Sequence, residues 1–297
     1  MGLALPALRL IAREHKKMPL HGPILTIGRQ CIYATVDDIK KLLAEEGLRP
    51  HTIPKDQALQ TNIPAWQGTP NAKNTNDQVF FAMLTGQPVT TIDVSDYENA
   101  ELIWDLNFPI PDHLVHMFNT VIDSGSLEHV FHIGQALINM NRLTAAGGRI
   151  IHITPANNYL EHGFYQFSPT LFIDYYGANN FRKISCAIIE QSTWDGNTGW
   201  QAWAWDTKRP YTNLMTSKMT ALFVATEKGK ESTEHSIPQQ GQASLHGEGG
   251  RTGELTVTDT QKKIIERLPV WLITLIKRVL GKDLRIKPWG LKRAGKL

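Results

Sequence analysis

Short apolar runs alternate with amphipathic segments along most of this chain. Five runs are typical of β-strands, namely residues 24–28, 89–95, 100–106, 119–125 and 145–155. Apolar residues at helical spacing predict helices over 35–47, 77–84 and 130–143. Continuous apolar strands separated by helices indicate a mostly parallel sheet with helices on both faces, which is an α/β fold. Two later β-rich segments, 184–193 and 219–228, are expected to form an antiparallel hairpin at the sheet edge.

The composition favours a globular protein with a sizeable core. Of its 297 residues, 41% are hydrophobic and 20% are charged. Its two cysteines, Cys31 and Cys186, do not suggest a disulfide scaffold, although a single disulfide stays open. In residues 1–19 the basic residues follow the apolar run, which is the wrong order for a secretory signal, so we expect a cytoplasmic protein. The three histidines His129, His132 and His152 do not form a recognisable metal site, so no metal is expected.

Charge is distributed unevenly along the chain. Residues 262–297 contain 11 Lys and Arg residues and two acids, whereas acids are in excess elsewhere. We therefore divide the chain into an N-terminal extension (1–21), an α/β domain (22–228), a flexible linker (229–258) and a basic amphipathic helix with a tail (259–297). The helix either packs on the domain or lies on an anionic membrane through 260–297, at the inner membrane face. Nucleic acid is not expected as a partner, because the rest of the chain is acidic.

Polar residues recur where the predicted strands end. In open α/β sheets ligands bind outside the carboxyl ends of the strands, where the loops converge. Gly28 follows the first strand, and Asp93 follows the second, where a carboxylate suits a ribose diol. Asp105, after the third, suits the exocyclic amine of adenine. Asp123 ends the fourth strand and is expected to face the same crevice. Each of these acids could also belong to an ordinary solvated turn.

Three segments together resemble class I S-adenosylmethionine-dependent methyltransferases. The segment "DSGSLEHV" is similar to the motif after the fourth strand of that family, and "LTAAGGRIIHITP" is similar to its fifth-strand motif. The segment "IDVSDYENAELIWDLNFPIP" is similar to a bacterial subgroup associated with polysaccharide gene clusters. The resemblance covers about residues 22–228. It implies a Rossmann-like sheet of seven strands whose last strand is antiparallel.

The resemblance also implies where S-adenosylmethionine would bind. It places the ribose on Asp93, the adenine near Asp105 and Leu106, and the methionine end near Gly28 and Asp123, with Gly125 allowing a close turn. The first motif of the family, an acid followed by glycines, is degenerate here. Thr26 stands at the position of the acid, and Gly28 is the only glycine retained.

Candidate acceptor-binding residues follow the fifth strand. Residues 157–169 contain Asn157, Tyr165 and Gln166, together with His162, which could act as a general base or could simply bond local backbone. A tryptophan-rich segment, 194–211, could form a carbohydrate-binding platform or could cover a sheet edge.

These observations favour an enzyme that transfers a methyl group from S-adenosylmethionine to a hydroxyl of a small-molecule or glycan acceptor. The alternative is a non-catalytic methyltransferase-like protein that binds a glycan or a protein partner. An enzyme that binds a nucleotide sugar or a nicotinamide cofactor is a third interpretation, disfavoured because the chain lacks Gly-x-Gly-x-x-Gly. The sequence does not predict the oligomeric state.

Overall fold

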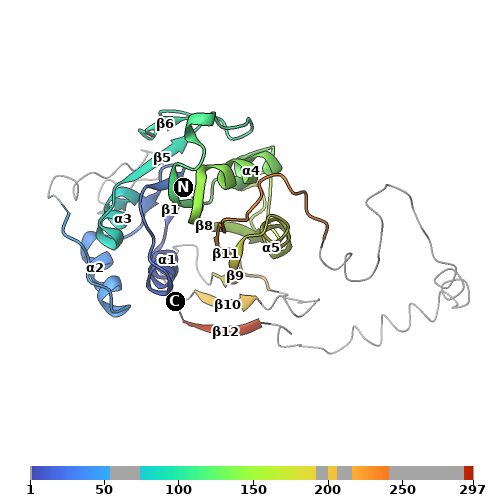
Figure 1. Ribbon diagram of the computed structural model, residues 1–297. Coiled ribbons are helices and arrows are strands. Elements are labelled where there is room, and N and C mark those ends of the chain that lie inside the picture. The colour runs from blue at the N-terminus through green and yellow to red at the C-terminus, as the bar shows by residue number, and fades with distance from the viewer. Residues whose placement is uncertain (1, 54–73, 192–199, 206–215, 241–290, 297) are drawn as a thin grey trace, which may run out of the picture.

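A nine-stranded sheet forms the centre of the molecule (Figure 1), in a computed structural model that describes residues 2–53, 74–191, 200–205, 216–240 and 291–296. The strand order is β12-β10-β9-β11-β8-β7-β2-β5-β6. The strands are β2 (Ile24–Ile27), β5 (Val89–Asp93), β6 (Leu102–Ile103), β7 (Phe118–Ser124), β8 (Thr144–Asn157), β9 (Arg182–Glu190), β10 (Gln201–Trp205), β11 (Thr220–Glu227) and β12 (Leu291–Lys296).

The strand directions confirm the predicted fold class. Strands β6, β5, β2, β7 and β8 are parallel to their neighbours, and β11 is antiparallel to β8. This is a mostly parallel Rossmann-like sheet. The predicted pairing of 184–193 with 219–228 is confirmed, because β9 and β11 are antiparallel. Their position at the edge is wrong, since β10 and then β12 extend the sheet beyond β9 and bring it to nine strands rather than seven.

Helices cover both faces of the sheet, as predicted. The helices are α1 (Leu5–Lys17), α2 (Val36–Glu45), α3 (Asp77–Thr85), α4 (Ile133–Leu143) and α5 (Pro169–Ala178). Helices α1, α2 and α3 pack on one face, and α4 and α5 pack on the other (Figure 1). Successive side chains of β8 point to opposite faces of the sheet. Ile151 belongs to the core packed under α1, α2 and α3, and Ile150 belongs to the core packed under α4 and α5. A small sheet of β1 (Gly2–Leu3), β3 (Cys31–Ile32) and β4 (Thr75–Asn76) lies beside them.

Local sequence signals set the ends of α2 and α3. At the start of α2, Thr35 and Asp38 form a reciprocal capping box, and Gly47 adopts a φ of +73° just after its end. Asn76 caps the start of α3 by accepting from the backbone N–H of Val79, and Gly86 ends it in the left-handed conformation. Two other elements are shorter than expected. Helix α4 begins at Ile133, and β6 contains only Leu102 and Ile103.

Helix α1 lies in the first 21 residues, for which the sequence analysis predicted no element. Its residues Leu8 and Ile11 are fully buried in the core shared with α2 and α3. Arg149 of β8 ties this helix to the sheet, because its guanidinium donates to Glu14 Oε2 at 2.8 Å and to the carbonyl of Met18 at 3.0 Å. The helix is thus part of the packed fold.

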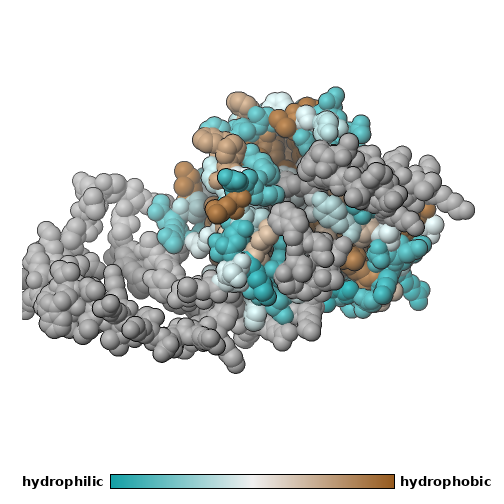
Figure 2. Space-filling model, turned by 180° about the vertical axis from the view of Figure 1, so that it is seen from behind, coloured by the Kyte–Doolittle hydropathy of each residue, from teal (hydrophilic) through white to brown (hydrophobic). Residues whose placement is uncertain are grey.

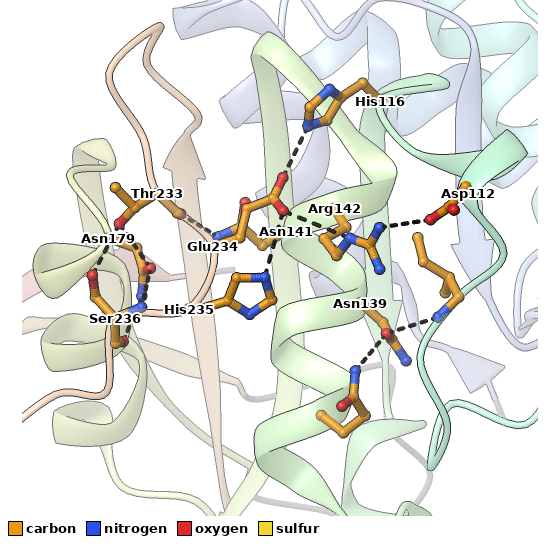
Figure 3. Close-up of polar contacts among 12 residues, drawn as sticks. Asp112, His116, Asn139, Asn141, Arg142, Asn179, Thr233, Glu234, His235 and Ser236 are labelled. Carbon is orange, nitrogen blue, oxygen red and sulfur yellow. Dashed lines mark hydrogen bonds and ion pairs between the residues drawn. The ribbon is translucent and has the colours of Figure 1, made fainter.

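The segment after β11 runs across α4 and α5 and is held by polar contacts (Figure 3). Glu234 lies between His116 and Arg142, with Nε2 of His116 at 2.9 Å and Nε of Arg142 at 3.6 Å. Asn179, at the end of α5, accepts from the hydroxyl of Thr233 and from the backbone N–H of Ser236, both at 3.0 Å. These contacts fix residues 233–236 against the two helices.

Several expectations fall on residues outside the described ranges. They include most of the predicted linker at 229–258 and most of the predicted helix and tail at 259–297. Within 259–297 only strand β12 is described. Among the described residues, no helix is long and apolar enough to cross a membrane. Figure 2 shows one face of the molecule, on which hydrophobic residues form small groups among hydrophilic ones. Cys31 and Cys186 are both free thiols and both buried.

Candidate functional site

The carboxyl ends of β2, β5 and β7 meet at Gly28. This residue has a φ of +73°, and its N–H donates to the carbonyl of Ile92 at 2.8 Å. A Cβ atom at Gly28 would lie 2.9 Å from Oγ of Ser126 and 3.5 Å from Oδ2 of Asp93. Only glycine adopts this φ at low cost, and a side chain here would crowd Ser126. Gly28 is itself partly exposed, so a ligand can approach its backbone.

Asp93, at the end of β5, is the carboxylate nearest to this opening. Its Oδ1 accepts from the backbone N–H of Ser95 at 3.2 Å, which fixes the orientation of the side chain. Its Oδ2 is directed towards Gly28 and accepts no hydrogen bond from the described residues. The structure thus brings together Asp93 and Gly28, two of the residues that the sequence analysis selected. The partly exposed carboxylate is a suitable acceptor for ligand hydroxyls.

A buried carboxylate that the sequence analysis missed supports the turn at Gly28. Asp77, the first residue of α3, is completely buried. Its Oδ2 accepts from the hydroxyl of Thr26 at 3.1 Å and from the backbone N–H of Gln30 at 3.0 Å. The acid that the resemblance expects at Thr26 is therefore absent from that position, but a carboxylate lies beside it. No sequence signal linked these residues, because Asp77 follows a long polar segment in the chain.

Arg29 links Asp77 to the neighbouring edge of the sheet. Its Nη1 lies 3.3 Å from Oδ1 of Asp77, and its Nη2 donates to Oε1 of Glu101 at 2.8 Å. Burial raises the pKa of Asp77, and the charge of Arg29 opposes this effect. Glu101 also accepts from the backbone N–H of Thr91 at 2.7 Å. The residues that follow β2 are thereby fixed between α3 and β6.

Asp105 and Leu106, predicted to lie near an adenine, follow β6. Oδ1 of Asp105 accepts from both the backbone N–H and the side-chain Nδ2 of Asn107, at 2.9 and 2.8 Å. Leu106 is buried in the core, and its carbonyl accepts from Asn139 of α4 at 3.0 Å. The Asp105 side chain thus stabilises its own turn, and the leucine side chain packs inward.

Asp123 is placed differently from the expectation. It is completely buried, and its Oδ1 accepts from the backbone N–H groups of Ser126 and Leu127 at 3.0 and 3.2 Å. Its Oδ2 lies 3.0 Å from Nδ1 of His152, whose Nε2 lies 2.6 Å from the hydroxyl of Tyr176. The expectation that this carboxylate faces the crevice is wrong, because the neighbouring strand supplies a buried partner for it. Gly125 adopts a φ of +80°, which makes the close turn after β7.

The loop after β7 continues into a cluster of three titratable residues. Glu128 and His129 belong to a single 3₁₀ turn, η3 (Leu127–His129), and His162 lies in the loop after β8. Nε2 of His162 is 3.4 Å from Oε1 of Glu128. The Glu128 interaction raises the pKa of His162, whereas burial lowers the pKa of His129. The sequence alone suggests His132 as the neighbour of His129 and gives no signal for His162, which is 33 positions from His129.

The predicted acceptor-binding residues lie in the same loop as His162. The hydroxyl of Tyr165 donates to the carbonyl of Phe131 at 2.6 Å, and Oε1 of Gln166 accepts from the backbone N–H of Tyr159 at 2.9 Å. These two side chains hold the loop in shape. Asn157, at the end of β8, is exposed.

The tryptophan-rich segment is described only in part. Trp200 is buried in the core on the α1 face, and Trp203 and Trp205 of β10 pack against the core on the other face. Neither interpretation foresaw that Trp203 and Trp205 lie in a strand of the sheet itself, paired between β9 and β12. The other aromatic residues of 194–211 lie outside the described ranges.

Comparison with known proteins gives matches to solved structures but none to family models or curated proteins. Among solved structures, TehB from Haemophilus influenzae has 14% identity and a TM-score of 0.33, covering 49% of this chain and 51% of TehB. A SAM-dependent methyltransferase from Thermotoga maritima has 10% identity and a TM-score of 0.35, covering 75% and 89% of the two chains.

A third solved structure is phosphoethanolamine N-methyltransferase 2 from Haemonchus contortus, in complex with phosphomonomethylethanolamine and S-adenosylhomocysteine. It has 9% identity and a TM-score of 0.40, and the match covers 75% of this chain and 53% of that enzyme. The present chain thus spans about half the length of this enzyme and of TehB. Likenesses of this size carry no argument about the activity of this chain.

Proposed function

We propose that this protein transfers a methyl group from S-adenosylmethionine to a hydroxyl of a small-molecule or glycan acceptor. The observation that carries the proposal is the meeting of Gly28 and Asp93 at the carboxyl ends of β2 and β5. A partly exposed glycine backbone lies there beside a partly exposed carboxylate whose Oδ2 accepts no hydrogen bond from the described residues. This arrangement fits a nucleoside ligand, because a carboxylate accepts hydrogen bonds from two vicinal hydroxyls.

The cofactor would be held by the residues around this opening. Asp93 would bind the ribose hydroxyls, and the backbone around Gly28 would contact the amino-acid end. Asp77 would hold the turn at Gly28 in place through the hydrogen bonds that it accepts from Thr26 and Gln30. When bound, S-adenosylmethionine supplies a methyl group on a positively charged sulfur.

His162 is the residue of this chain that would remove the proton of the acceptor. Its side chain is 38% exposed, so an acceptor can reach it, and the Glu128 carboxylate beside it would stabilise the imidazolium. Because Nε2 faces Glu128, the acceptor would give its proton to Nδ1, leaving its oxygen with the electron pair that would form the new bond to the methyl carbon while the bond from that carbon to sulfur breaks. The loop that carries Asn157, Tyr165 and Gln166 would line the part of the site where the acceptor binds.

A transfer assay tests the proposal. Protein incubated with methyl-labelled S-adenosylmethionine and a set of hydroxylated sugars should label one class of acceptor. His162→Gln should reduce kcat by about 10²-fold or more and leave the affinity for the cofactor unchanged, because its role is proton transfer. Binding of the cofactor without transfer to any hydroxyl acceptor would favour the non-catalytic alternative.

A further inference from the structure

Glu128, His129 and His162 form a compact cluster with the composition of a metal site. One ligand atom from each residue can be chosen so that all three lie within 4.8 Å of one another. The two imidazole rings have centroids 5.3 Å apart, with an interplanar angle of 56°. Two imidazoles and one carboxylate that converge in this way are a set of protein ligands that binds catalytic zinc.

Glu128 supplies an independent observation that points to a ligand. The residue is 0% exposed, and its carboxylate oxygens accept no hydrogen bond of good geometry from the described residues, with His162 Nε2 3.4 Å from Oε1 as the ion-pair contact. The loop after β8 closes over it, because the N–H of Phe164 donates to the Glu128 carbonyl at 2.8 Å and a Cβ on Gly163 would lie 3.0 Å from Cγ of Glu128. Water therefore has little access to this carboxylate. A buried carboxylate without a hydrogen bond is costly, and a bound cation would stabilise it.

We propose that Glu128, His129 and His162 bind a divalent transition-metal ion, with Zn²⁺ as the best fit. The distance of 3.4 Å between Nε2 of His162 and Oε1 of Glu128 is close to the edge of a tetrahedron. Metal bonds of about 2.0–2.1 Å give a ligand-to-ligand edge of about 3.3 Å. Mg²⁺ and Ca²⁺ fit poorly, because they select oxygen ligands and two of these three ligands are nitrogen atoms.

The site has an entry path and an open coordination position. His129 and His162 are both exposed, so an ion can approach from solvent, whereas Glu128 lies beneath them. Three protein ligands leave the fourth tetrahedral position for water or for an incoming oxygen atom. Coordination by Nε2 of His162 would replace the proton that this nitrogen can share with Glu128. An ion and a proton would therefore compete for this nitrogen.

Metal binding can be measured without any cofactor or acceptor. Full-length protein treated with EDTA and desalted should bind one Zn²⁺ per chain in a calorimetric titration, and Co²⁺ should give the visible absorption of a tetrahedral site. Mg²⁺ should give no saturable heat. Loss of a direct ligand in His129→Ala or His162→Ala should weaken Zn²⁺ binding by at least the ~10–100-fold that is typical of losing an outer partner. Circular dichroism checks that each variant is folded.

His132→Ala is the matched control. His132 is exposed, lies three positions from His129 and is not part of the cluster, so its loss should leave Zn²⁺ binding unchanged. Absence of Zn²⁺ binding to folded wild-type protein would overturn the proposal. Equal binding by wild type, His129→Ala and His162→Ala would also overturn it, because the ion would then be held elsewhere. Neither result depends on whether the protein binds S-adenosylmethionine.

Discussion

Thr26 and Asp77 are separated by 51 positions in the chain, and their side chains are joined by a buried hydrogen bond of 3.1 Å. Asp77 also accepts from the backbone N–H of Gln30, so it holds both sides of the turn at Gly28. The motif around Gly28 lacks its acid in the sequence, because Thr26 stands at that position. In the structure the carboxylate of Asp77 lies beside Thr26. The acid comes from α3 rather than from the end of β2.

Replacing Asp77 should destabilise the fold and the turn together. Asp77→Ala leaves the buried N–H of Gln30 and part of the Arg29 charge without an acceptor, whereas the Thr26 hydroxyl keeps its hydrogen bond to the Thr91 hydroxyl at 2.8 Å. We expect a loss of about 2–4 kcal/mol in the free energy of unfolding, measured by urea denaturation. Asp77→Asn is the control, because its amide oxygen still accepts hydrogen bonds, and it should lose less. Equal stability of wild type and Asp77→Ala would contradict the role of this carboxylate.

A side chain at Gly28 should close the proposed cofactor site. Gly28→Ala places a Cβ 2.9 Å from Oγ of Ser126 at a φ of +73°, which costs about 1–2 kcal/mol in the backbone alone. Both the free energy of unfolding and the affinity for S-adenosylmethionine should fall. Gly177→Ala is a matched control in α5, where a Cβ meets nothing within 4 Å, and it should be neutral or stabilising. Similar behaviour of the two variants would argue against a special role for Gly28.

The contacts of Glu234 predict a pH-dependent contribution to stability. Burial alone would raise its pKa, but hydrogen bonds from His116 and Lys228 and the Lys228 charge outweigh burial and lower it. A carboxylate whose pKa is lowered by folding stabilises the protein above its unfolded value, near 4.5, and this effect is lost as pH falls through the folded value.

Glu234→Gln should therefore lower the free energy of unfolding at pH 7, by about 1 kcal/mol or less because the carboxylate is partly exposed. Below pH 4 the difference between variant and wild type should shrink. Asp112→Asn removes a fully exposed partner of Arg142 and should change little at any pH. Urea denaturation at pH 7 and at pH 3.5 measures both variants, and a difference that grows on acidification would contradict the assignment.

The sequence predicted those parts of the fold that depend on local signals. The helix that begins after Thr35, the helix that ends before Gly86 and the apolar strand β8 each depend on signals within a few residues, and each is found where it was expected. The same is true of the close turn at Gly125.

The contacts that were missed join residues far apart in the chain. Asp77 with Thr26 and His162 with Glu128 depend on how the strands are ordered in the sheet, which no local pattern specifies. The placement of Asp123 failed for the same reason, because its partner His152 lies on the adjacent strand. Strand β10 was missed because its tryptophans alternate within a segment that also suits a binding platform.

The central claim is that the opening beside Gly28 and Asp93 binds S-adenosylmethionine. The most direct test is a calorimetric titration of S-adenosylhomocysteine into wild type, Asp93→Ala and Asp96→Ala. Wild type should bind one molecule per chain, and Asp93→Ala should bind at least about 10-fold more weakly, because a charged hydrogen-bond acceptor is lost. Asp96→Ala removes a nearby exposed acid and should bind like wild type. No binding heat from folded wild-type protein, or equal affinity of wild type and Asp93→Ala, would contradict the account.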